Sequence, residues 1–405
     1  MTDELVGKTI GERIQTIRER TGKTRVTVAG LVGRSEQWLK DIEKGRRNPP
    51  RLDMLLRLGE VLGVRSLTEI TGDNDLMRAT ERRALHAVVP AIREAIESVE
   101  LGVVEAAVTS DELAARVERA WKLWHASSNP RADAGAMLPG IIRDGRRAVR
   151  SLDGEDRRTA AAALSGAYAL SEQVLAWVSD APLLWLAADR CMAAAQIADR
   201  PHTLAAAAWV TGNVWRSTGR EEDAWYLTQD AVALLAPYLD GDPTARALWG
   251  ACQLHSAITA ARVGREGDAL RCVDKATSMA RGLPDGYAHD WTLFGVPNAE
   301  LTAVSVQVDL RKAGGALDAA SAVDPDSIPS MDRRARLWLE IARAYGQRGD
   351  WTAALNVLTK ATSVSGESMR CHPLSRGLAG ELVTKGGRLI EREARTLANQ
   401  LGVTV

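Results

Sequence analysis

A short stretch of the chain, GRSEQWLKDIEKGRRNPP at residues 33–50, concentrates amide and basic side chains on one expected helix and its exit. An amide such as Gln37 can pair with a donor and an acceptor on the edge of a base, and arginines such as Arg46 and Arg47 pair with phosphate oxygens. Residues 8–51 contain 12 Lys and Arg against 5 Asp and Glu, a net charge of +7, whereas the whole chain has a formal net charge of zero. This asymmetry indicates that the N-terminal end contacts a polyanion.

The elements that position these side chains are short helices, four or five of which fit residues 8–70. The first has isoleucines three or four residues apart and is expected to end near Gly22. Thr24 is expected to cap the second helix, and Ser35 the third, which should run to about Lys44. A fourth helix, with leucines along one face, should follow the Pro-Pro pair.

The spacing between the second and third helices is the most informative pattern. Counted from Arg25 as position one, Ala29 stands at position five and Gly33 at position nine. The small residue Ala29 lets two helices approach closely, and Gly33 supplies a turn with positive φ. Leu39 and Ile42 should anchor the third helix on the core and leave its opposite face exposed. These features predict a helix-turn-helix, in which the second helix of the pair enters the major groove.

Residues 10–64 resemble the Xre family of repressor-type helix-turn-helix domains, on the helix-one arginine, the Ala-Gly turn, IEKGRRNP and the closing LGEVLGV. The resemblance implies that double-stranded DNA is the partner. The residues assigned to DNA contact are Arg25, Arg34, Ser35, Glu36, Gln37, Lys40, Asp41, Arg46, Arg47 and Asn48.

Within this set, the resemblance places base contacts at Glu36, Gln37 and Asp41, and the remaining contacts mainly on phosphates. Gln37 suits an adenine. The acidic side chains of Glu36 and Asp41 at base-contact positions depart from the family's pattern, because a carboxylate can pair only with a cytosine amine. Arg34 and Lys40 are therefore expected to carry more of the contact. Trp38 either stacks on DNA or packs on the core, and packing is the favoured interpretation.

A second pattern recurs three times in the C-terminal part of the chain: Gly, four residues, Ala, six residues, Ala. The three copies are Gly219/Ala224/Ala231, Gly264/Ala269/Ala276 and Gly349/Ala354/Ala361. The glycine should end one helix, and the two alanines should lie where a second helix packs closely on it. Helical pairs of this type stack into a solenoid with a concave face. The pattern predicts degenerate tetratricopeptide-like repeats; another α-solenoid or a single irregular bundle remains an alternative.

The C-terminal region also resembles the tetratricopeptide-like arm of actinobacterial Xre-type regulators and, more distantly, bacterial pheromone receptors whose arm binds a short peptide. The segments LWLAADRCMAAAQIADRP and ALWGACQLHSAITAARVGREGDAL carry part of this likeness. The resemblance implies a peptide or small-molecule effector. Amide side chains pair well with a peptide backbone. The candidate ligand-binding residues are Asn213, Gln253, Arg262 and Asn298.

The sequence thus predicts an all-α chain: an N-terminal helix-turn-helix bundle followed by a tetratricopeptide-like α-solenoid. We assign residues 1–72 to the DNA-binding domain, 73–130 to a helical linker or dimerisation region, and 131–405 to a sensor and interaction domain. A homodimer is expected because paired half-sites need two domains. Either a helix at 74–98 or the glycine-interrupted helix at 378–400 would form its interface.

Other function classes fit the sequence less well. GxSxG, P-loop and close metal-ligand spacings are absent from the sequence, so neither catalysis, a cofactor nor a metal is expected. The N-terminus has no signal-peptide pattern and no apolar run is long enough to cross a membrane, which predicts a cytoplasmic, nucleoid-associated protein. The favoured function is a sequence-specific transcriptional regulator controlled through its arm. The alternative is an adaptor whose arm binds a protein partner and tethers it to DNA.

Overall fold

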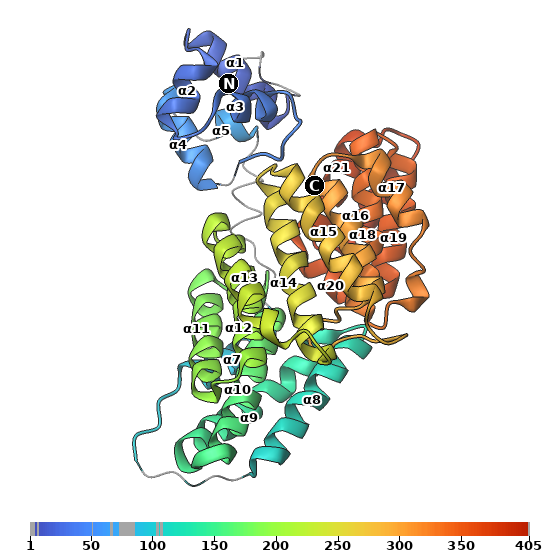
Figure 1. The fold of residues 1–405 in the computed structure, drawn as a ribbon. Helices are drawn as coiled ribbons and strands as arrows, with labels where there is room; N and C mark the ends of the chain where they lie inside the picture. The colour runs from blue at the N-terminus through green and yellow to red at the C-terminus, as the bar shows by residue number, and fades with distance from the viewer. Residues whose placement is uncertain are drawn as a thin grey trace. The chain divides into compact units, whose positions relative to one another are not determined.

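The computed structural model describes residues 5, 8–50, 52–64, 68–72, 86–102, 105 and 108–403, and their regular secondary structure is helical throughout, with no strand among them. Contacts divide the chain into one unit of Met1–Arg83 with Asp309–Arg311 and a second unit of Ala84–Val308 with Lys312–Val405. We call the residues up to Arg83 the head and those from Ala84 the arm. Figure 1 labels the helices of both. No helix in the described ranges combines the length and hydropathy needed to span a bilayer. The fold is therefore all-α, as predicted.

The head is a bundle of short helices around one apolar core. Its helices are α1 (Ile10–Arg20), α2 (Arg25–Leu31), α3 (Glu36–Glu43), α4 (Leu52–Leu62) and α5 (Thr68–Thr71). The predicted caps are confirmed: the Thr24 hydroxyl accepts a hydrogen bond from the Thr27 amide, and the Ser35 hydroxyl accepts one from the Trp38 amide. Leu58, on the apolar face of α4, is fully buried in the head core.

The arm is a succession of helices that pack mainly on their neighbours in the chain (Figure 1). Its α-helices are α7 (Val89–Glu97), α8 (Ser110–Ala126), α9 (Pro130–Ser151), α10 (Gly154–Leu175), α11 (Ala181–Ala198), α12 (Pro201–Ser217), α13 (Glu221–Leu235), α14 (Pro243–Arg262), α15 (Glu266–Arg281), α16 (Val296–Asp309), α17 (Ala313–Ser321), α18 (Met331–Arg348), α19 (Trp351–Val364), α20 (Gly366–Cys371), α21 (Pro373–Lys385) and α22 (Glu391–Gln400). Two short 3₁₀ turns, η2 (Ala236–Tyr238) and η3 (Pro325–Ser327), interrupt the connections.

The predicted repeat register is confirmed at each of its three copies. Gly219, Gly264 and Gly349 have φ angles of 92°, 75° and 78°, and each lies between the two helices of a hairpin: α12/α13, α14/α15 and α18/α19. The six paired alanines on the second helices are all buried. Successive first helices also contact each other, α10 with α12 and α12 with α14, which is the arrangement of a tetratricopeptide-like solenoid.

Early helices of the arm contact helices near its C-terminal end. Helix α8 contacts α18, and α9 contacts α20. Between α9 and α20 the Glu367 carboxylate accepts hydrogen bonds from the backbone amides of Arg131 at 2.7 Å and Ala132 at 3.1 Å, in the first turn of α9. Glu367 also lies 3.1 Å from the imidazole of His86. A carboxylate at a helix N-terminus satisfies amides that have no partner within the helix and interacts favourably with the helix dipole.

The described part of residues 73–130 packs with the arm. The buried residues of α7 and α8 share one continuous core with α9 to α14, and the assignment of this region as a helical linker or dimerisation region stays a prediction. Of the expected helix at 74–98, residues 74–85 lie outside the described residues, and α7 covers only Val89–Glu97. The segment 378–400 is divided between α21 and α22, and the break contains the Gly386-Gly387 pair as expected.

Candidate nucleic-acid interface

The core of the head fixes the orientation of α3. Leu39 and Ile42 are buried at 0% and 2% exposure, as the helix-turn-helix spacing predicts. The turn before α3 contains Gly33 at a φ of 71°, a left-handed conformation that a side chain would disfavour. At Gly11 of α1, a Cβ atom would lie 2.1 Å from the carbonyl oxygen of Ile42, so glycine permits the close approach of α1 to α3. The face of α3 opposite Leu39 is therefore held outward.

A buried group of three charges joins α1, α2 and α3. The Glu43 side chain, which has no solvent exposure, accepts hydrogen bonds from Arg18 Nε at 2.6 Å and from Arg25 Nε at 2.5 Å. The bond to Glu43 raises the pKa of Arg18 above its ordinary value, against the effect of burial. Arg25, predicted to clamp a phosphate, thus also has an internal structural role. Sequence reasoning missed Glu43, although a Glu in the apolar stripe of the third helix was a signal that it needed a buried cation.

The exposed face of α3 presents the predicted contact residues. Glu36, Gln37 and Lys40 are exposed, and Ser35 at the start of the helix is exposed as well. The Gln37 amide nitrogen donates to Asp41 Oδ1 at 2.8 Å, so these two side chains, one turn apart, form a preoriented pair. A pair of this kind leaves the Gln37 carbonyl oxygen and one amide hydrogen for other partners.

The chain that leaves α3 brings the predicted phosphate contacts beside this face. The backbone amides of Arg46 and Arg47 donate to the carbonyl oxygen of Asp41 at 2.8 Å and 3.2 Å, which turns the chain back against α3. Burial lowers the pKa of Arg47; the charge of Asp41 opposes this effect and that of Arg34 adds to it. The structure therefore brings Arg34, Asp41 and Arg47 within electrostatic range of one another. Arg46 is exposed and Asn48 is half-buried.

Trp38 packs on the head core as a partly buried side chain, in line with the favoured interpretation. The guanidinium carbon of Arg34 lies 6.0 Å from the centre of its ring, at the outer limit of a cation–π contact. The ring therefore supports Arg34 near the exposed face of α3.

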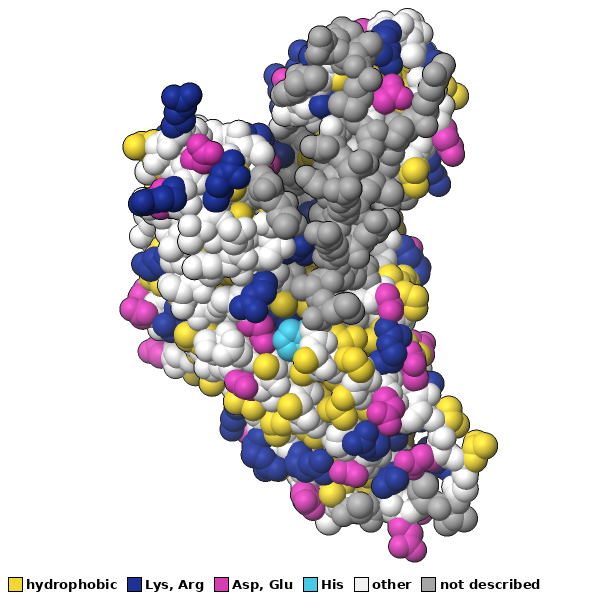
Figure 2. Space-filling view, turned by 180° about the vertical axis from the view of Figure 1, so that it is seen from behind, with side chains coloured by type: hydrophobic (Ala, Val, Ile, Leu, Met, Phe, Trp, Pro, Cys, Tyr) yellow, Lys and Arg dark blue, Asp and Glu magenta, His cyan; other side chains and the backbone are white. Residues whose placement is uncertain are grey.

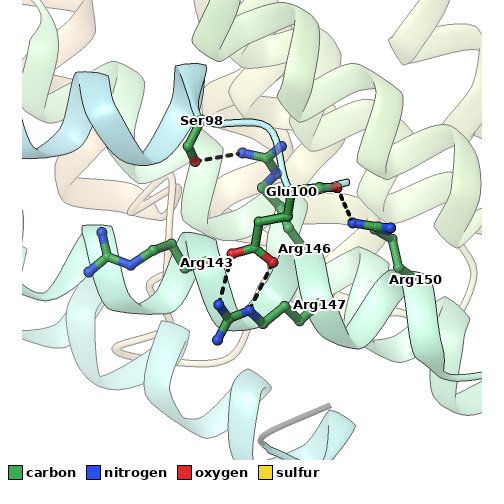
Figure 3. A pocket seen from close by; sticks show the side chains of 6 residues that line it. All are labelled: Ser98, Glu100, Arg143, Arg146, Arg147 and Arg150. Atoms are coloured by element: carbon green, nitrogen blue, oxygen red, sulfur yellow. Dashed lines mark hydrogen bonds and ion pairs between the residues drawn. The ribbon is translucent and has the colours of Figure 1, made fainter. Parts of the chain in front are cut away.

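Four further arginines lie along one face of α9, spaced as neighbours on a helix: Arg143, Arg146, Arg147 and Arg150. In Figure 3 three of them point to the segment that follows α7. Arg147 binds the Glu100 carboxylate at 2.8 Å and 3.0 Å, Arg146 binds the Ala95 carbonyl, and Arg150 binds the carbonyls of Glu100 and Gly102. Arg146, Arg147 and Arg150 thus anchor residues 95–102, which accounts for the clustering of these three without a nucleic acid.

Elsewhere on the arm, basic and acidic side chains are intermingled on the face seen in Figure 2, where neither sign forms a broad surface. The net charge of +7 over residues 8–51 has no counterpart on that face. Compared with that face of the arm, the α3 face of the head is better suited to a polyanion.

The structure does not bring the four candidate ligand-binding residues of the arm to one point. Asn213 has both ends of its amide paired, donating to Glu172 at 2.8 Å and accepting from Arg216 at 2.7 Å. Arg262 has interactions within the chain. Gln253 is buried at 1% exposure. Asn298 differs from the other three because it lines a cleft of about 660 Å³, described further below.

Comparisons with known proteins agree with the geometry of the head. Residues 9–70 match the family model described as a helix-turn-helix domain. No curated protein sequence matches the chain.

Two solved structures have a distant similarity to the chain. One is a Rap protein complexed with competence and sporulation factor, with 12% identity, 72% of this chain and 88% of that chain covered, and a TM-score of 0.42. The other is ComR from S. thermophilus in complex with DNA and its signalling peptide ComS. The identity is 14%, the match covers 94% of this chain and 100% of that chain, and the TM-score is 0.28.

The head is thus a helix-turn-helix domain, by its spacing, its caps, its turn and the family match. Such a domain indicates a regulator that binds DNA.

Proposed function

We propose that the chain is a sequence-specific transcriptional regulator of the Xre type, similar to the actinobacterial members that have a tetratricopeptide-like arm. The observation that carries this proposal is the exposed face of α3, which presents Gln37 and Lys40 while Leu39 and Ile42 are buried beneath it. In this proposal residues 1–72 bind duplex DNA, and the arm forms a homodimer, senses a peptide or small molecule, or does both.

The proposed division of labour follows the geometry of each side chain. Gln37 and Asp41 form one hydrogen-bonded unit at the centre of the exposed face, which suits contact with base edges. Arg46 and Arg47 follow the helix at its side, where phosphates flank a recognition helix. Glu36 is exposed at the first turn of α3, where a cytosine amine is the base group it can accept from.

Two substitutions test these roles in the full-length chain with a labelled fragment of its own upstream promoter. Gln37→Ala should relax preference at one base pair by about 1–3 kcal/mol, whereas Arg46→Ala should weaken binding to all sequences and reduce the salt slope by about one. Lys122→Ala, on an exposed residue of the arm, is the matched control and should leave both quantities unchanged. Equal effects of the two head variants on specific and nonspecific DNA would refute the assignment.

The sensor function is tested by titrating the same promoter fragment with and without extract of the native host. A change in DNA affinity that depends on extract supports control through the arm. Unchanged DNA affinity, together with a stable protein partner on the arm, would favour the adaptor instead. A ligand that changes DNA affinity tenfold needs a coupling free energy of about 1.4 kcal/mol.

A further inference from the structure

The arm contains a cleft that none of the contacts described above accounts for. It is lined by the end of α15 and the loop that follows it, by the first turn of α16, and by residues from 322 to the first turn of α18. Its volume of about 660 Å³ lies within the range of about 300–1,000 Å³ found for small-molecule sites.

The walls of the cleft are apolar and its rim is charged. Leu283, Leu293 and Ile328 line it and are themselves 8%, 7% and 2% exposed, so their packing fixes the shape of the walls. The exposed charged lining residues are Arg281, Asp285 and Asp324, and Glu300 is half-buried. With three acidic side chains near the rim, the cleft disfavours a ligand with several negative charges.

Arg333 is the half-buried cation of the cleft. Its guanidinium forms no hydrogen bond or ion pair with any of the described residues. Burial lowers its pKa, the charge of Arg336 adds to this effect, and the charges of Asp332 and Glu172 only partly oppose it. Because a guanidinium keeps its proton in proteins, the burial cost is not relieved by neutralisation. A single anionic group at Arg333 would offset that cost.

Asn298 adds an unpaired acceptor to the same cleft. Its amide nitrogen donates to the carbonyl of Thr292 at 3.3 Å, whereas its Oδ1 is buried and accepts no hydrogen bond within the described residues. The cleft thus combines a guanidinium that forms no ion pair, an acceptor that receives no hydrogen bond, and apolar walls. One carboxylate, an amide N–H and a branched apolar side chain would complement these three features.

We propose that this cleft binds a monocarboxylate with an adjacent apolar group, its carboxylate paired with Arg333 and its apolar group packed on Leu283, Leu293 and Ile328. The inference rests on the proposed sensor function of the arm and assigns its ligand chemistry. The last residue of a peptide and a free branched-chain acid share this chemistry. Only the peptide end also supplies the N–H that Asn298 can accept.

The test uses the full-length chain without DNA and three probes followed by ligand-observed NMR: N-acetyl-leucine, N-acetyl-leucinamide and 4-methylpentanoate. N-acetyl-leucine is expected to bind with a Kd of about millimolar order, as suits its small size, and at least about tenfold more tightly than the uncharged amide. Tighter binding of N-acetyl-leucine than of 4-methylpentanoate would identify a peptide end; equal binding would identify a free acid.

Arg333→Gln should reduce the affinity for N-acetyl-leucine to that of the amide, and Arg333→Lys, which keeps the charge, should retain part of it. Arg271→Gln is the matched control, because Arg271 is exposed on α15 and does not line the cleft. Three outcomes would each overturn the proposal: equal binding of N-acetyl-leucine and N-acetyl-leucinamide, no binding of any probe, or binding that Arg333→Gln does not affect. The first two are measured on the parent chain and need no variant.

Failure of this proposal is distinguishable from failure of the sensor function. If an Arg333→Gln chain still changes its promoter affinity with extract, the arm is a sensor and the cleft is not its site. If the probes bind as expected but neither they nor extract change promoter affinity, the cleft binds carboxylates and the sensor function is wrong.

Discussion

Removing the buried carboxylate of Glu43 should loosen the whole helix-turn-helix, because it connects three helices through two arginines. Removing one partner of a buried ion pair costs about 3–5 kcal/mol, since the other charge is left without compensation. Arg18 is 7% exposed in its side chain but keeps hydrogen bonds to the Lys23 carbonyl and to Glu19, both at 3.1 Å. Glu43→Ala should therefore cost the lower value, about 3 kcal/mol.

Hydrogen exchange followed by mass spectrometry on the full-length chain resolves this effect locally. Peptides from α1, α2 and α3 should lose about 100-fold in protection, whereas peptides from the arm should not change. Glu60→Ala, at an exposed position of α4, is the control and should leave the head protected. Protection of α1 to α3 that stays within about threefold of the parent chain would show that Glu43 does not hold the helices together.

Three further predictions concern the arm, each read out by urea unfolding unless stated. Ala354→Leu should overpack the α18/α19 hairpin, where Ala354 is fully buried, and lower the free energy of unfolding by about 1–3 kcal/mol. Thr352→Leu, on the exposed side of α19, should not, and equal stability of the two variants would show that the repeat register is wrong. Burial raises the pKa of Glu172 from 4.5 to about 7, so ionisation of this group should reduce the free energy of unfolding by about 3 kcal/mol as the pH rises between those values. Glu172→Gln should remove that loss, and a variant with the same pH dependence as the parent chain would contradict the prediction. Glu367→Gln should lower the free energy of unfolding by about 1–3 kcal/mol and speed hydrogen exchange in the first turn of α9, whereas Glu391→Gln, on the exposed face of α22, should do neither. Exchange in the first turn of α9 that stays slow in Glu367→Gln would refute the capping role.

The local features of the fold were predictable from the sequence because each depends on residues close together in the chain. Thr24 and Ser35 cap helices whose first amides lie three residues away, and Gly33 adopts its left-handed turn regardless of distant neighbours. The glycine–alanine register likewise concerns adjacent helices, so it located Ala224 and Ala354 in tight contacts without a structure. The DNA-contact roles remain predictions, although the structure places their side chains on and beside one face of α3.

The features that sequence reasoning missed depend on residues far apart in the chain. Arg25 looked like a free phosphate clamp, because the position of Glu43 in the apolar stripe of the next helix indicated a buried cation without showing which basic residue it would be. Asn213 looked like a free amide, yet Glu172, two helices earlier, binds it in the interior. Polar residues on the inner helices of a repeat array were read as ligand contacts, whereas some of them satisfy one another.

Contacts between early and late helices of the arm have consequences that an open array would not have. In an open solenoid each repeat contacts only its neighbours, and stability is close to a sum of local terms. Here the contacts of α8 with α18 and of α9 with α20 join segments more than 200 residues apart, as the pairing of Arg131 with Glu367 at a separation of 236 residues shows. Loop-closure entropy opposes such contacts and slows their formation, so the neighbouring hairpins should form first and these contacts last. The early and late helices of the arm then stabilise each other through the hydrogen bonds that Glu367 accepts from the first turn of α9.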